Sequence, residues 1–204
     1  MEENFELLNI PDYTSLTSLM YPKENTVLYD RDGSIDSAKH PLVFCAKNDE
    51  YTCFYGFRVT SHPCRDDSLR DYFYVSLSKD DIEYKNYFKM KSVSYVSCED
   101  ICVFEGFVYK YFLNNGNIKN KAYLEKFTEV IVKHILLQEL GLSKYNENTD
   151  IFLNLIGYKR EDIINLKMYK MFYKKFTDSS NKQIVQNDMN LQRNKILGNK
   201  KTIK

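Results

Sequence analysis

Short runs of aromatic and β-branched residues follow one another from residue 26 onward, with polar turn sequences between them. The runs are TVLY (26–29), PLVFCA (41–46), YTCFYGFRVTS (51–61), YFYVSL (72–77) and MKSVSYVSCEDICVFEG (90–106). Such residues suit a pleated sheet, and the intervening DRDGS and KNDE are typical of tight turns. We predict an antiparallel β-core over residues 26–113, closed into a small barrel or sandwich because closure removes exposed sheet edges.

Beyond NNGN (114–117) the apolar spacing changes to that of a helix. One stripe at i, i+3 and i+4 intervals contains Tyr123, Leu124, Phe127, Val130, Ile131, His134 and Ile135. Gly141 is the expected C-cap of this helix, and Thr149 or Asp150 is expected to cap a short second one. A third stretch, REDIINLKMYKMFYKKF (160–176), also has helical register. The sequence therefore predicts an α+β protein with a helical C-terminal extension over residues 118–178.

The two ends of the chain differ from these segments. Residues 1–25 are acidic and are interrupted by Pro11, so we expect an N-terminal arm or short helix there. Residues 179–204 carry six basic residues, one acidic residue and little apolar periodicity. We expect a basic, flexible tail that orders only on a partner.

The net charge of +1 hides an uneven distribution. Residues 1–36 carry −6, residues 37–117 carry −1 and residues 118–204 carry +8. The basic C-terminal part suggests a polyanionic partner. Its most concentrated feature is one side of the third helical stretch, which contains Lys167, Lys170, Lys174 and Lys175. These lysines either bind RNA or form a solvated helix face.

Cysteine usage points to a reducing, cytoplasmic setting. The five cysteines are an odd number, and no secretory signal pattern precedes them. Cys98 and Cys102 are the pair closest to metal-ligand spacing, but no second pair accompanies them, so we interpret the cysteines as small buried residues. No metal or cofactor is predicted. No apolar run reaches the length of a membrane span, so no membrane association is predicted either.

The pairing of two predicted strands would gather the residues best suited to chemistry. If PLVFC and CFYGFRVTS are antiparallel neighbours, Lys39 and His40 at the start of the first approach Thr60, Ser61 and His62 at the end of the second. Ammonium, hydroxyl and imidazole groups suit a phosphodiester, because they can neutralise nonbridging oxygens, donate hydrogen bonds and transfer a proton. Cleavage of RNA through its own 2′-hydroxyl needs no metal.

Four pieces of the chain also resemble a known family. They are DGSIDSAKHPLVF, FRVTS, YFYVSL and MKSVSYVSCEDI, which lie within about residues 27–104. Their order is similar to that in the MazF/PemK toxin endoribonucleases and in the related ToxN/AbiQ-type toxins of RNA-inhibited systems. The resemblance implies an SH3-like (PemK-like) barrel that cleaves single-stranded RNA without metal. It also implies a toxin that a protein or RNA antitoxin holds in check.

By position, the family's catalytic pair corresponds to Lys39 or His40 together with Thr60 and Ser61. Many members have arginine directly before the proline, where this chain has His40. Lys39 would then supply the positive charge and His40 the proton transfer. Arg58, His62 and Arg65 are expected to contact RNA phosphates, although His62 also suits a simple turn.

A second reading remains open beside the enzyme. A noncatalytic SH3-like module could bind RNA or a protein through the same β-core and its basic helices. His134 lies on the apolar stripe of a helix and is expected to be a hydrogen-bonded core or interface histidine. The sequence is compatible with a homo-oligomer.

Overall fold

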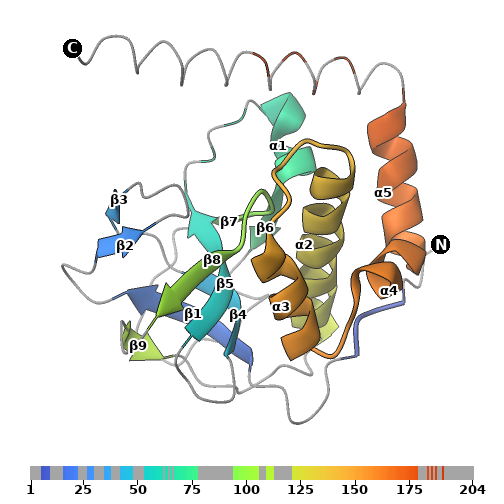
Figure 1. Ribbon diagram of the computed structural model, residues 1–204. Coiled ribbons are helices and arrows are strands. Elements are labelled where there is room, and N and C mark those ends of the chain that lie inside the picture. Colours follow the sequence, from blue (N-terminus) through green and yellow to red (C-terminus); the bar gives the residue numbers. More distant parts are fainter. Residues whose placement is uncertain are drawn as a thin grey trace, which may run out of the picture.

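The computed structural model describes residues 6–9, 16–22, 27–29, 35–37, 42–47, 53–61, 63, 65, 67–77, 94–105, 109–112 and 121–178, with positions 183, 185, 187 and 190. Antiparallel strands form one layer, and the main helices lie together on one side of them (Figure 1). The strands are β1 (Leu16–Pro22), β2 (Val27–Tyr29), β3 (Ile35–Ser37), β4 (Leu42–Lys47), β5 (Cys53–Thr60), β6 (Tyr74–Leu77), β7 (Ser94–Ser97), β8 (Cys102–Glu105) and β9 (Tyr109–Phe112). The helices are α1 (Asp67–Phe73), α2 (Lys121–Glu139), α3 (Glu147–Leu155), α4 (Arg160–Asn165) and α5 (Lys167–Thr177).

The main sheet runs in the order β6-β7-β5-β4-β1-β9, with β8 also paired to β5, and β2 and β3 form a separate hairpin. The α+β class predicted from the sequence is therefore confirmed. The predicted closure is not observed, because β6 and β9 lie at opposite ends of the described sheet and do not pair with each other. An open sheet can keep the apolar side chains of one face away from water if other elements cover that face. Here the helices cover one face of the sheet (Figure 1).

Two expectations for residues 1–113 were wrong. Leu16–Pro22, predicted as part of an acidic arm or short helix, is strand β1, which lies between β4 and β9. Tyr72 and Phe73, predicted to begin a strand, instead complete α1. The first error has a clear cause: pairing with strands distant in sequence decides the structure of β1, and local composition does not reveal it.

The C-terminal half follows its helical pattern with three differences. Asn146 caps α3, its side-chain oxygen accepting from the Asn148 N–H, whereas Thr149 and Asp150 lie inside the helix. The third predicted stretch divides at Leu166, whose ψ of 143° is extended, into α4 and α5. Val185, in the predicted flexible tail, is helical and buried in the core.

Gly141 ends α2 as the sequence predicted. Its φ of +67° is the left-handed conformation that glycine adopts without a steric penalty. The Gly141 N–H donates to the Gln138 carbonyl and the Leu142 N–H to the Leu137 carbonyl, which satisfies carbonyls at the end of the helix. This is the Schellman arrangement.

A β-bulge in β4 directs an aromatic ring into the core. Val43 pairs with Phe57 and Ala46 with Tyr55, so two residues of β4 lie opposite the single Gly56 of β5. One of the two, Phe44, has a φ of +54°, an unusual value for a residue with a side chain. Its ring is fully buried against α2. Burial of the ring offsets the strain of the backbone.

The bulge leaves no room for a side chain at Gly56. A Cβ there would lie 2.6 Å from the Cys45 Sγ. Gly56→Ala is expected to lower the free energy of unfolding by about 1–3 kcal/mol through overpacking. Cys45→Ala in the same chain removes the clashing sulfur, so the double variant should recover part of that loss. Urea unfolding of both single variants and the double variant measures the coupling, and independent, additive losses would contradict the proposed contact.

Candidate functional site

The predicted reaction site lies at the end of β5. Lys39, His40 and His62 are outside the described residues. Leu42 pairs with Arg58 and Val43 with Phe57, so the beginning of β4 lies beside the end of β5. The strand pairing on which the sequence hypothesis depends is therefore confirmed, while the positions of its imidazoles and of Lys39 stay predictions.

The end of β5 is only partly buried. Arg58 and Thr60 are half-buried and Ser61 is exposed. Thr60 pairs with Tyr95 of β7. Residues directly opposite each other in an antiparallel pair project from the same face, so the Thr60 hydroxyl and the Tyr95 ring share one face of the sheet.

Sequence reasoning missed a cation close to this position. The Arg70 Nη1 donates to the Tyr95 hydroxyl at 3.3 Å, and its guanidinium lies 5.0 Å from the centre of the Tyr95 ring. Arg70 also forms an ion pair with Asp67 one turn earlier in α1. The Asp-x-x-Arg spacing was the available signal, but it is informative only once DSLRDYF is known to be a helix.

Arg65 has a different environment from the one predicted for a phosphate contact. It is 9% exposed, its Nη2 lies 2.5 Å from Glu99 Oε1, and its guanidinium lies 4.2 Å from the centre of the Phe73 ring. Glu99 follows β7, and Phe73 ends α1. Arg65 therefore joins the segment before α1 to the turn after β7, and its charge is already neutralised.

The four lysines of α5 are exposed, as both RNA binding and a solvated helix face require. We call Lys167, Lys170, Lys174 and Lys175 the α5 lysine face. The opposite side of the helix buries Met168, Tyr169 and Phe176. Lys175 lies over the Tyr72 ring of α1, 5.3 Å from its centre, and Phe176 packs edge-on against the same ring.

His134 is a buried core histidine, as predicted. Its Nδ1 lies 2.9 Å from the Cys98 carbonyl oxygen and its Nε2 lies 2.9 Å from Thr149 Oγ1. Because a carbonyl can only accept, Nδ1 carries the proton and Nε2 accepts, which is the neutral imidazole. Burial lowers the pKa of His134 to about 4; the bond to the Cys98 carbonyl opposes this shift and the nearby Arg160 reinforces it.

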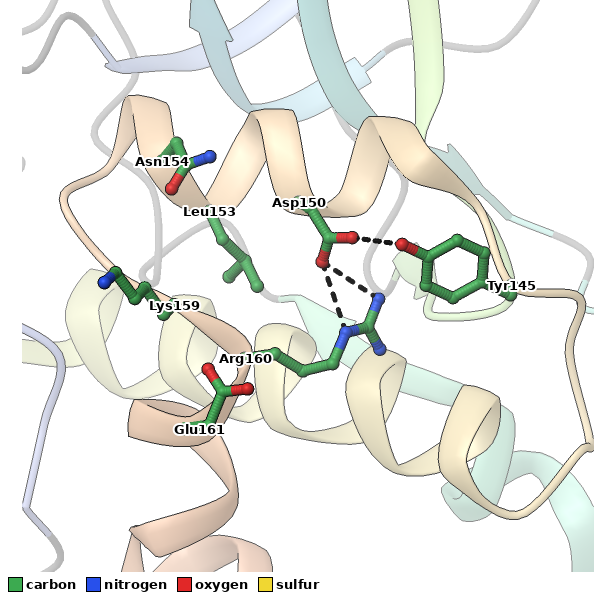
Figure 2. Close-up of a pocket in the computed structure, with 7 residues that line it drawn as sticks. All are labelled: Tyr145, Asp150, Leu153, Asn154, Lys159, Arg160 and Glu161. Atoms are coloured by element: carbon green, nitrogen blue, oxygen red, sulfur yellow. Dashed lines mark hydrogen bonds and ion pairs between the residues drawn. The ribbon is translucent and has the colours of Figure 1, made fainter.

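A pocket of about 440 Å³ lies between α3 and the beginning of α4 (Figure 2). In it, Arg160 binds Asp150 through Nε at 3.2 Å and Glu139 through Nη1 at 3.4 Å, and the Tyr145 hydroxyl donates to Asp150. Lys159 and Glu161 also line it. The charged residues that line the pocket are two acids, Asp150 and Glu161, and two bases, Lys159 and Arg160, so it offers no net charge to a ligand.

Over the described ranges, no three histidine, cysteine or acidic side chains cluster in a way that could hold a metal ion. None of the helices described in the structure is both long and apolar enough to cross a membrane. Comparisons of the chain with protein-family models, with curated proteins and with solved structures gave no match.

The low pKa of His134 makes stability depend on pH. In the unfolded chain the imidazole takes up a proton below about pH 6.5, whereas in the folded protein it does so only near pH 4. The unfolded state thus binds more protons in this window, and the free energy of unfolding should fall as pH falls from 6.5 to 4, by about 3 kcal/mol in total.

Urea unfolding of the wild type and of His134→Gln between these pH values measures this effect. Carboxylates titrate in both proteins, so the difference between the two curves isolates the imidazole. The wild-type advantage should shrink toward pH 4. Parallel curves would show that His134 is not held neutral by the fold.

Proposed function

We propose that the protein is a metal-independent endoribonuclease that cleaves single-stranded RNA, and that it acts in the cytoplasm as the toxin of a toxin–antitoxin or phage-defence system. The observation that carries the proposal is the β4–β5 register, in which Leu42 lies opposite Arg58. It sets the beginning of one strand, which Lys39 and His40 precede, beside the end of the other, where Thr60 and Ser61 lie.

In the proposed reaction the RNA 2′-hydroxyl attacks the adjacent phosphorus and the bond to the 5′-oxygen breaks. His40 transfers the proton of the 2′-hydroxyl to the departing 5′-oxygen, Lys39 stabilises charge on the phosphate, and Thr60 and Ser61 position the phosphate. The products are a 2′,3′-cyclic phosphate and a 5′-hydroxyl. Arg58 is half-buried at the same strand end and is a candidate phosphate contact.

We also propose that the β-core is related to the SH3-like (PemK-like) barrel and that a protein or RNA antitoxin inhibits it. The adjacent apolar strands β4 and β5 support this assignment, because β4 begins and β5 ends at the proposed site. The tyrosine of β7 and the arginine of α1 add a ring and a cation next to Thr60, two groups that favour RNA.

The alternative is a noncatalytic module that binds RNA or a protein. The specific observation in its favour is the α5 lysine face, because its exposed charges could bind a partner without any reaction site. Product chemistry separates the two proposals, because a binding module leaves RNA intact.

Purified protein should cleave single-stranded RNA in the presence of chelator and leave 2′,3′-cyclic phosphate ends. His40→Ala should slow cleavage by about a hundredfold or more, through loss of proton transfer. Thr60→Val, which removes the hydroxyl and keeps the shape, should also lose most activity, while the matched Thr60→Ser should retain it. Intact RNA with the wild type, or equal rates for Thr60→Val and Thr60→Ser, would refute the assignment.

A further inference from the structure

We propose that the α5 lysine face, together with Tyr173, is a binding surface for single-stranded RNA that holds the substrate outside the reaction site. The role of this surface in substrate binding rests on the ribonuclease proposed above. The new elements are its location on α5 and the way in which it recognises RNA. α5 packs against α2 and, through Phe176 and Lys175, against Tyr72 of α1. α1 also carries Arg70, which contacts Tyr95 opposite Thr60.

The charge state of the face is the first observation. Lys167, Lys170 and Lys174 have no ion-pair partner in the part of the chain that the structure describes, and α5 itself contains no acidic residue. By contrast, the largely buried cations Arg65, Lys133 and Arg160 are each bound to a carboxylate. At 1.5 Å per residue, Lys167 and Lys174 are about 10 Å apart along the axis. That spacing is close to the screening length in physiological salt, so the lysines together attract neighbouring phosphates.

An aromatic platform beside the lysines is the second observation. Tyr173 is 46% exposed, and its ring stacks on Tyr169 with centres 6.2 Å apart and an angle of 22° between the planes. Tyr169 is buried, so the exposed ring is supported from below. Lys170 lies one turn before Tyr173 on the helix surface.

The combination identifies the partner. A base can stack on Tyr173 while the phosphates beside it contact Lys170 and Lys174, which is how proteins bind single strands without reading their sequence. An acidic peptide or an anionic lipid surface would use the lysines but leave the supported ring unused. Asp178 follows α5 directly, and its carboxylate would repel a phosphate at that position. The face therefore accommodates only a few nucleotides at this end.

Fluorescence anisotropy with a 2′-O-methyl oligouridine of about 12 nucleotides tests the proposal, because this RNA has no 2′-hydroxyl and cannot be cleaved. Log-affinity against log-salt should have a slope of about −2 to −3 for three or four phosphate contacts. Lys170→Gln with Lys174→Gln should reduce the magnitude of that slope by about 1.4. Tyr173→Ala should weaken binding about fivefold or more, and Tyr173→Phe should restore it.

A charge-matched control is Lys121→Gln with Lys126→Gln, which removes two lysines from α2. Equal weakening of RNA binding by the two double variants would overturn the location of the surface on α5. Displacement of the RNA by polyglutamate at equal charge concentration would overturn the preference for nucleic acid. Binding that maps to α5 in a protein that cuts no RNA would refute the nuclease alone. Cleavage with unchanged binding and KM in the α5 variants would refute this surface alone.

Discussion

Burial of α2 against the sheet is the interaction on which the rest of the structure depends. The Phe44 ring, directed inward by the bulge of β4, lies edge-on to Tyr123 at 5.1 Å and to Phe127 at 5.4 Å between ring centres. From the next strand, Phe57 contacts Phe152 of α3 in the same way. Edge-on aromatic pairs add about 0.5–1.5 kcal/mol each to the burial of their area. Strained backbone at Phe44 is thus a consequence of docking the helix.

Polar groups on α2 then fix what surrounds it. Lys133 is 3% exposed, yet its Nζ donates to the Tyr74 carbonyl at 3.0 Å and pairs with Glu129 at 2.8 Å. His134 bonds the turn after β7 and, through Thr149, the helix α3. A buried ammonium or imidazole without these partners would cost several kcal/mol. The network therefore sets the position of β6 and β7 relative to the helices, and with it the end of β5 where Thr60 lies.

The sequence was most informative where structure is local. The stripe from Tyr123 to Ile135 gave α2, and two apolar runs joined by a short turn gave β4 and β5 with their pairing. It failed where distant segments decide: β1 is a strand because β4 and β9 flank it, and no periodicity reveals that. The same limit applies to the candidate site. Thr60 and Ser61 follow from strand order, but Arg70 becomes visible only when α1 brings it to Tyr95.

Buried and exposed cations in the described part of the chain have different surroundings. Arg65 and Arg160 are largely buried and each holds a carboxylate from another part of the chain, so removing either would leave a partly buried acid without its partner. The lysines of α5 face solvent, and packing of the helix rests on its other side. Exposed ion pairs contribute little to stability, and exposed lysines on one helix face repel one another slightly. Folding alone gives no reason to gather these lysines, and their clustering favours the polyanionic partner proposed for α5.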